Sequence, residues 1–222
     1  VIALQKVLNL ETLPQRIEGY DISNIQGDET VASMVVFQQG KPQKSGYRRF
    51  RIRGVSGSDD YAAMREVLRR RFIHGEESEE EKRRFASDPD LLLIDGGRGQ
   101  LNAALEILSD LVLDNVPVVS LAKREEEIYI PQREEPLKLD RRHEGLRLLQ
   151  RVRDESHRFA VTYHRARRDK KLKKSILTEI PGIGPAKARL LLRTFGSVEK
   201  IRTTSVEEMA KLPGITVALA ES

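Results

Sequence analysis

DLLLIDGGRGQL, residues 90–101, is the stretch that decides the fold of this chain. Its apolar run lacks the alternation of a half-exposed strand and is typical of a strand buried on both faces of a sheet. Gly96 and Gly97 end that strand, and a helix is expected over residues 100–111. Residues 116–122, VPVVSLA, predict the next buried strand. Strand, helix and strand at this spacing form a right-handed parallel crossover unit.

Other expected elements surround this unit. The strands expected before it, in an antiparallel arrangement, cover residues 16–23, 30–39 and 47–53. A helix should follow, with Ser58 or Asp59 as its N-cap. After the unit, a short hairpin is expected between residues 127–131 and 137–139, and a long helix over residues 142–170. This order predicts an α/β class with a ribonuclease H-like mixed sheet flanked by helices, and it leaves other α/β arrangements open.

A short repeat marks the last part of the chain. Residues 180–185, IPGIGP, return in weaker form as LPGIT at residues 212–216. A Gly-Ile-Gly turn lets the backbone approach a partner closely and leaves free N–H groups at a helix start, where the helix dipole favours a phosphate. The residues predicted to bind nucleic acid here are Gly182, Ile183, Gly184 and Lys187. The alternative is that the two turns only pack against each other.

Basic residues are concentrated in one segment. Residues 141–174 contain thirteen Lys or Arg and four Asp or Glu, although the net charge of the whole 222-residue chain is only +5. This concentration predicts a surface that faces a polyanion, with an ordinary solvated helix face as the alternative. The basic residues expected to hold a nucleic-acid backbone are Lys123, Arg158, Arg165 and Arg168.

The composition excludes several classes of protein. No cysteine is present, which rules out disulfides and thiolate zinc sites and fits a reducing cytoplasm. No run of about eighteen apolar residues occurs, so no membrane partner is expected. The chain begins at Val1 with sequence typical of the middle of a protein, which suggests a fragment. We expect one α/β domain over residues 1–174 and a small helical domain over residues 175–222, joined by a basic linker near residues 173–175.

Two aspartates carry the predicted chemistry. Asp21 lies inside an expected strand, where a carboxylate is unfavourable and needs a cation or hydrogen-bond donors. Asp95 ends the buried strand at the carboxyl edge of the sheet, where ligand sites of α/β folds gather. If the two strands are neighbours, both carboxylates can hold one Mg²⁺ or Mn²⁺ ion. The alternatives are a backbone hydrogen bond for Asp21 and a simple turn position for Asp95.

Two further residues are weaker candidates for catalysis. Asp60 lies in the first turn of an expected helix, where an acidic side chain commonly serves the helix dipole. His157 lies on the long basic helix and can act as a general base or a metal ligand, although the spacing of the four histidines does not single it out. Asp154, three residues earlier, is close enough on a helix to orient the imidazole ring of His157.

Five segments, taken together and in this order, resemble the C-terminal half of the UvrC family, a component of the bacterial UvrABC excinuclease. They are GYDISNIQG (19–27), DDYAAMREVLRRRF (59–72), DLLLIDGGRGQL (90–101), RDESHRFAVTYHR (153–165) and IPGIGPAKARLLLRTFGS (180–197). The resemblance covers nearly the whole chain, and five motifs in sequence make it specific.

The resemblance implies a nucleotide-excision-repair nuclease, in which a ribonuclease H-like endonuclease domain precedes tandem helix-hairpin-helix motifs. It implies cutting with Mg²⁺ or Mn²⁺ on the 5′ side of a lesion in duplex DNA. The matching motifs make Asp21, Asp95 and His157 the catalytic triad and also implicate Asp60. The second hairpin departs from the pattern, because Thr216 stands where its second glycine is expected. The implied partner is a complex of DNA with UvrB, another component of the excinuclease, and the main docking segment for it lies upstream of this chain.

Two other functions remain open on the sequence. One is a catalytically inert DNA-binding scaffold with a nuclease-like fold, and the other is a nuclease that cuts RNA. The acidic pair argues against the scaffold, because a protein that only binds DNA gains nothing from carboxylates beside a phosphate.

Overall fold

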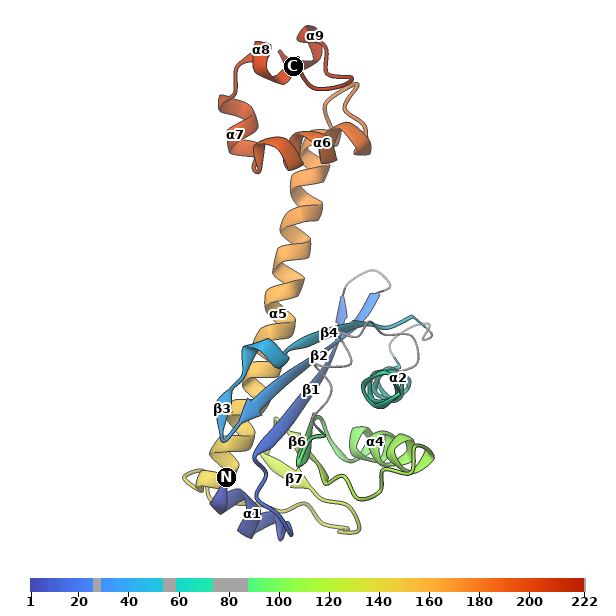
Figure 1. Cartoon of the computed structure of the whole chain (residues 1–222), viewed down its shortest axis with the longest axis vertical. Helices are drawn as coiled ribbons and strands as arrows, with labels where there is room; N and C mark the ends of the chain where they lie inside the picture. Colours follow the sequence, from blue (N-terminus) through green and yellow to red (C-terminus); the bar gives the residue numbers. More distant parts are fainter. Residues whose placement is uncertain (26–28, 54–58, 74–87, 222) are drawn as a thin grey trace. The chain divides into compact units, whose positions relative to one another are not determined.

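One mixed sheet forms the centre of the N-terminal part of the chain (Figure 1). The structure, a computed structural model, describes residues 1–25, 29–53, 59–73 and 88–221, without the side chains of residues 24, 25, 29 and 163–175. Among the described residues, seven strands pair in the order β3-β2-β1-β5-β6-β7, with β4 also beside β2. The strands are β1 (Arg16–Ile25), β2 (Glu29–Gln38), β3 (Lys41–Pro42), β4 (Arg48–Arg51), β5 (Leu91–Asp95), β6 (Val118–Ala122) and β7 (Glu127–Tyr129).

The directions of the strands agree with the sequence prediction. β1 runs antiparallel to β2 and parallel to β5, and β5 runs parallel to β6. Helix α4 (Arg98–Asp110) connects β5 to β6, which confirms the predicted crossover unit. β7 is antiparallel to β6, and its residue Ile128 also bridges to Leu137, so the predicted hairpin is present in a short form. A ribonuclease H-like mixed sheet flanked by helices is therefore the fold of this part.

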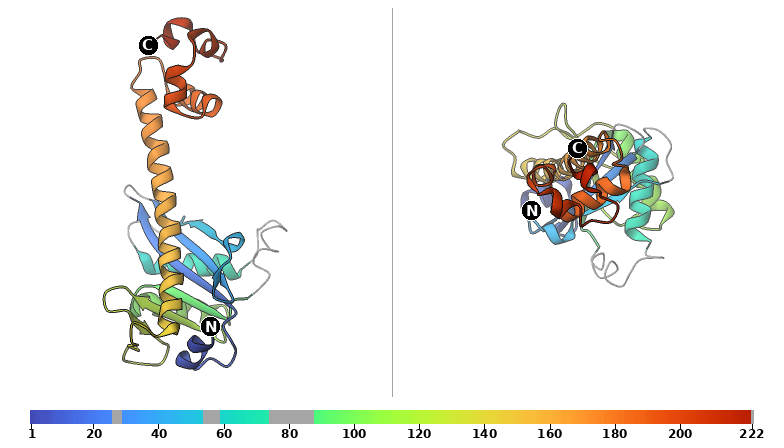
Figure 2. Two further views of the ribbon diagram at one scale, coloured as in Figure 1. Left: turned by 90° about the vertical axis from the view of Figure 1, so that its left-hand side faces the viewer. Right: turned by 90° about the horizontal axis from the view of Figure 1, so that it is seen from above.

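Helices cover both faces of the sheet (Figures 1 and 2). α2 (Asp60–Phe72) and α4 pack on one face, and α1 (Ile2–Leu8) and the first half of α5 (Glu144–Thr178) pack on the other. The predicted N-cap of α2 is confirmed for Asp59, whose carboxylate accepts hydrogen bonds from the first N–H groups of the helix. Ser58, the other predicted cap, lies outside the described residues.

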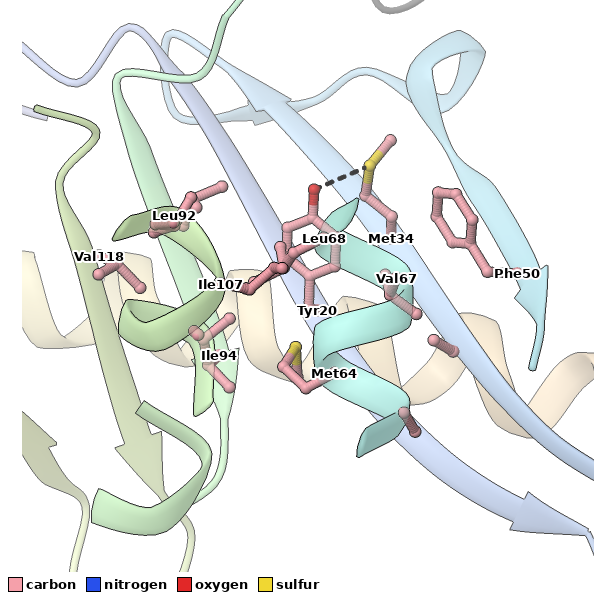
Figure 3. Packing of buried hydrophobic residues seen from close by; sticks show 14 of the residues in the cluster. Tyr20, Met34, Phe50, Met64, Val67, Leu68, Leu92, Ile94, Ile107 and Val118 are labelled. Carbon is pink, nitrogen blue, oxygen red and sulfur yellow. Dashed lines mark hydrogen bonds between the residues drawn. The ribbon is translucent and has the colours of Figure 1, made fainter. Parts of the chain in front are cut away.

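The face covered by α2 and α4 holds one apolar core (Figure 3). Tyr20 of β1 and Ile94 of β5 point into this core, where they meet Met64 of α2. Because side chains alternate along a strand, the residues that follow them, Asp21 and Asp95, point to the opposite face, which α5 covers.

A buried charged cluster lies beneath α2. The fully buried Glu18 carboxylate accepts hydrogen bonds from the guanidinium groups of Arg16 (2.8 Å) and Arg71 (3.0 Å) and from the hydroxyl of Tyr20 (2.8 Å). A buried charge persists only where it is paired and hydrogen-bonded. Arg71 belongs to α2 and Glu18 to β1, so this cluster fixes where the helix lies on the sheet.

The last part of the chain forms a second unit, since the chain divides into residues 1–161 and 162–222. After the end of α5, its helices are α6 (Pro185–Phe195), α7 (Val198–Thr203), α8 (Val206–Met209) and α9 (Val217–Ala220). They share a core made of Leu177, Ile183, Ala188, Leu191, Val198, Ile201, Met209 and Ile215. This unit therefore has an apolar interior of its own.

The backbone around residues 173–175, where the sequence predicts a linker, is helical and belongs to α5. No Gly or Pro occurs between Gly145 and Pro181, so nothing in this stretch stops a helix. The predicted domain boundary after residue 174 therefore falls inside a helix. Among the described helices, none is both long and apolar enough to cross a membrane.

Candidate metal centre and nucleic-acid interface

Asp21 and Asp95 lie at the same level on neighbouring parallel strands. Tyr20 of β1 pairs with Ile94 of β5, and each aspartate is the next residue of its strand. Both carboxylates leave the sheet on the side that α5 covers. The condition that the sequence left open, that the two strands be neighbours, is met.

Asp21, Asp95 and His157 come together at this point. Each offers one oxygen or nitrogen atom, and these atoms all lie within 4.8 Å of one another. Nδ1 of His157 is 3.8 Å from Oδ1 of Asp21, and the hydroxyl of Ser23 donates a 2.7 Å hydrogen bond to Oδ2 of the same carboxylate. Asp21 is buried, whereas the His157 side chain is 48% exposed. No other such group of His, Asp or Glu occurs in the part of the chain that the structure describes.

The ionised form of Asp95 is unfavourable in this position. Burial raises its pKa from 3.8 to about 6, with Lys123 acting in the opposite direction and the negative charge of Asp21 adding to the rise. Two carboxylates at a poorly solvated site repel each other, and a divalent cation between them relieves that repulsion. The donor set of two carboxylate oxygens and one imidazole nitrogen therefore fits a divalent metal ion.

Lys123 also reaches this cluster. It follows the end of β6, and its Nζ lies 3.4 Å from Oδ2 of Asp95 and 3.4 Å from Nδ1 of His157. The sequence predicted Lys123 only as a contact to nucleic acid and did not place it beside Asp95. A signal was present, since Leu121 belongs to the core on the α5 face and residue 123 has the same parity along the chain.

Contacts between α5 and the sheet position His157. The hydroxyl of Ser33, directly opposite Asp21 in the β1–β2 pairing, donates a 2.9 Å hydrogen bond to the carbonyl of Ser156. Both serines are fully buried. The expectation that Asp154 orients the imidazole ring finds no support, because this carboxylate bonds the guanidinium of Arg153 at 2.9 and 3.0 Å and is largely exposed.

Asp60 is the first residue of α2 and does not belong to the metal-ligand group. Its neighbour Tyr61 packs against α4, where a Cβ added to Gly99 would lie 2.5 Å from the tyrosine oxygen. Gly99 follows Asp95 by four residues, so the start of α2 lies at the same edge of the sheet as the metal-ligand group. A catalytic role for Asp60 stays a prediction.

Comparison with known families decides where the chain belongs. Residues 5–161 match the family model described as the UvrC RNAse H endonuclease domain. The chain belongs to this UvrC family. Residues 174–222 match a second model, described as a SAM-like helix-hairpin-helix tandem.

Similar proteins carry the same family name. UvrABC system protein C of Dehalococcoides mccartyi is 53% identical over 221 residues, which are 99% of this chain and 36% of that protein. The protein of that name from Gloeobacter violaceus is 48% identical over 225 residues, 100% of this chain and 35% of its own length. The UvrC-family chain thus spans about a third of the length of the curated relatives it matches.

A solved structure also shows a partial likeness. The crystal structure of human ENDOV is 21% identical, covers 50% of this chain and 46% of its own, and gives a TM-score of 0.32. A likeness at this level supports no inference about the UvrC-family chain.

The basic residues predicted to hold DNA have mixed environments. Arg158 is exposed but ion-paired, with its guanidinium 2.6 and 2.7 Å from the carboxylate oxygens of Glu155. The same carboxylate accepts a 2.9 Å hydrogen bond from the hydroxyl of Tyr47. The side chains of Arg165 and Arg168 lie outside the described part of α5. Glu155 therefore already pairs with the guanidinium that the sequence predicts as a phosphate contact in this UvrC-family chain.

The two glycine turns of the second unit share one backbone geometry. Gly182 and Gly214 both have positive φ, +87° and +78°, and each precedes a buried isoleucine of the shared core. Ile183 is one of these two, and its N–H donates a 3.0 Å hydrogen bond to the carbonyl of Ile180, so both its side chain and its N–H are engaged within the unit. Gly184, the N-cap of α6, has open space where a side chain would be. Nζ of Lys187 lies 3.0 Å from the carbonyl oxygen of Gly182 and donates a hydrogen bond to it.

Proposed function

We propose that this UvrC-family chain is a DNA endonuclease that uses Mg²⁺ or Mn²⁺. The observation that carries the proposal is the meeting of Asp21, Asp95 and His157 within 4.8 Å, from three separate elements of the fold. A scaffold that only binds DNA has no use for two repelling carboxylates at a surface that faces phosphates. The membership of residues 5–161 in an endonuclease-domain family supports the same function.

The residues of the site have different roles, which follow from how deeply each side chain is buried. The carboxylates of Asp21 and Asp95 are the groups that hold the metal, and the Ser23 hydroxyl keeps one Asp21 oxygen in place. When bound, a divalent cation neutralises charge on the phosphate under attack and favours the ionised form of a water molecule. His157 is half-exposed beside the carboxylates, so it can receive the proton that the attacking water loses.

The second unit supplies the grip on DNA. We assign catalysis to residues 1–174 and DNA binding to residues 175–222, in keeping with the two family matches at 5–161 and 174–222. The N–H groups in the first turn of α6, at Ala186 and Lys187, contact phosphate oxygens, which makes the binding independent of base sequence. Lys187, Lys123, Arg158, Arg165 and Arg168 add positive charge along the backbone.

The biological role follows from the relatives named UvrABC system protein C. We assign to the chain the incision on the 5′ side of a lesion in duplex DNA during nucleotide excision repair in the cytoplasm. Its partner is the complex of DNA with the UvrB component of the excinuclease. These assignments concern the longer protein of which this sequence matches about a third.

Nicking of a lesion-bearing duplex in Mg²⁺ tests the proposal. Asp95→Asn and Asp21→Asn should each reduce the nicking rate by about 100-fold or more, because each removes the negative charge of a metal ligand while leaving the shape of the side chain nearly unchanged. DNA affinity should hold or rise. Asp110→Asn, at the exposed end of α4, is the matched control and should cut like the wild type.

Two results would contradict the endonuclease. If Asp95→Asn nicks as fast as the wild type, the cluster is not the catalytic centre. If the wild type binds the duplex but does not nick it in Mg²⁺ or Mn²⁺, alone or with UvrB present, the inert scaffold is the better description. A parallel assay on an RNA–DNA hybrid separates DNA cutting from RNA cutting.

A further inference from the structure

The ammonium of Lys123 lies beside two of the side chains that could hold a metal ion. Nζ is 3.4 Å from an Asp95 carboxylate oxygen and 3.4 Å from the His157 ring nitrogen, and these two residues are two of the three candidate ligands. The lysine side chain is 52% exposed, so it has solvent on its other side. A cation of the protein itself therefore already contacts the ligand group.

The fold places this ammonium in the cluster. Leu121 of β6 pairs with Asp95 of β5, and Lys123 follows it by two residues, so both side chains leave the sheet on the α5 face. The turn after β6 is tied to α5 by a partly buried ion pair, in which Nη1 of Arg153 is 2.7 Å from the Glu126 carboxylate. Because both ends of this turn are held, the lysine approaches Asp95 from a constrained backbone.

A lysine ammonium and a divalent ion satisfy the same carboxylate. Lys123 opposes the effect of burial on Asp95, since its positive charge lowers the pKa of that group. A metal that takes the Asp95 oxygens must displace the ammonium, because two cations cannot share one buried carboxylate without strong repulsion. Displacement is feasible since the lysine stem is flexible and half-exposed.

We propose that Lys123 is the resident counter-ion of the Asp21–Asp95 pair and competes with the metal for it. In the metal-free protein its ammonium neutralises the pair and keeps the ligands together. When the metal enters, the ammonium leaves Asp95 and becomes available to a DNA phosphate. This inference rests on the proposed function, because it needs a divalent cation to bind at the same group.

Mn²⁺ binding to the 222-residue chain without DNA tests this role, with free Mn²⁺ measured by electron paramagnetic resonance at pH 8. Lys123→Met should bind Mn²⁺ about three- to tenfold more tightly than the wild type, since the competing half-exposed ion pair is gone. Lys123→Arg keeps the cation and should stay within about twofold of the wild type. Lys138→Met is the control, because Lys138 pairs with Glu127 outside the ligand group.

A second readout covers the case in which the Met variant folds poorly. Lys123→Gln should have a lower melting temperature than the wild type in EDTA at pH 8. Saturating Mn²⁺ should raise the melting temperature of this variant by more than it raises that of the wild type. A residue that serves folding alone would lower both melting temperatures equally.

The outcomes separate the two proposals. Equal or weaker Mn²⁺ affinity in both Lys123→Met and Lys123→Gln overturns the counter-ion role and leaves the proposed endonuclease standing. If neither the wild type nor the Lys123 variants bind Mn²⁺, both proposals are overturned. Tighter binding in the neutral variants with wild-type affinity in Lys123→Arg supports the counter-ion role.

Discussion

Gly19 of β1 and Val152 of α5 are in such close contact that no side chain fits between them. A Cβ built on Gly19 would lie 2.5 Å from Cγ1 of Val152 and 3.2 Å from Cγ2 of Val35. A valine in a helix has one strongly preferred rotamer, so this methyl group cannot turn away. Because α5 carries His157, the absence of a side chain at Gly19 sets how near the imidazole comes to Asp21.

Gly19→Ala should therefore destabilise the protein by about 1–3 kcal/mol through overpacking. It should also weaken Mn²⁺ binding, since α5 and His157 move away from the carboxylates. Urea unfolding followed by tyrosine fluorescence measures the first effect, because four of the five tyrosines lie in residues 1–161. The double variant Gly19→Ala/Val152→Ala should recover part of the loss, and strictly additive effects would argue against this contact.

Asp95→Asn should stabilise the metal-free protein at alkaline pH. The pKa of Asp95 is raised in the folded state, from 3.8 to about 6, so its protonated form favours folding. That contribution is fully present below pH 4 and is lost as the pH rises through 6. In EDTA, the free energy of unfolding of the variant should equal that of the wild type at pH 4 and exceed it by about 1–3 kcal/mol at pH 8.

The matching measurement is urea unfolding at the two pH values, repeated with saturating Mg²⁺. The metal should stabilise the wild type at pH 8 and leave Asp95→Asn nearly unchanged, since the variant lacks a charged ligand. An equal response of both proteins to Mg²⁺ would show that the ion binds elsewhere.

Arg71→Met should be among the most destabilising substitutions in α2. It leaves the fully buried Glu18 carboxylate with Arg16 as its remaining guanidinium partner, and breaking a buried pair typically costs about 3–5 kcal/mol. Arg65→Met is the control, because its ion pair with Glu106 is exposed and should contribute less than about 1 kcal/mol. If both variants lose the same stability, the buried cluster does not hold α2 on the sheet.

Two glycines of the first hairpin should respond differently to alanine. Gly182 has φ +87°, where an alanine is strained by about 1–2 kcal/mol, so Gly182→Ala should lower the melting temperature of the second unit. Gly184 has an extended backbone and open space, so Gly184→Ala should fold normally.

DNA affinity then isolates the role of the turn. A methyl group on Gly184 stands between the backbone and an approaching phosphate, so Gly184→Ala should bind duplex DNA about three- to tenfold more weakly while its melting temperature stays the same. Ser205→Ala is the control variant, because Ser205 caps α8 and is distant in sequence from the first hairpin. Gly196→Ala cannot serve as the control, because Gly196 also has a positive φ and the alanine would be strained. Unchanged DNA affinity in Gly184→Ala would favour hairpins that only pack together.

Much of the α/β architecture could be predicted from local patterns. The apolar run before Asp95, the Gly-Gly that ends it and the Asp59 cap of α2 act through short-range physics, and each is confirmed in the structure. The backbone near residue 174, where the sequence predicts a basic linker, is instead helical and part of α5. A stretch of Lys, Arg and Leu without Gly or Pro is a good helix former.

The candidate site was also predicted only in part. The sequence determined which residue types could do chemistry: aspartates in or at the end of strands, and a histidine on a basic helix. It could not assign Lys123 to Asp95, nor show that His157 comes within 4.8 Å of Asp21 and Asp95. Only the tertiary structure decided these pairings, because they depend on strand register and on how closely α5 approaches the sheet. Such contacts join residues far apart in the chain, and no local pattern encodes the distance between them.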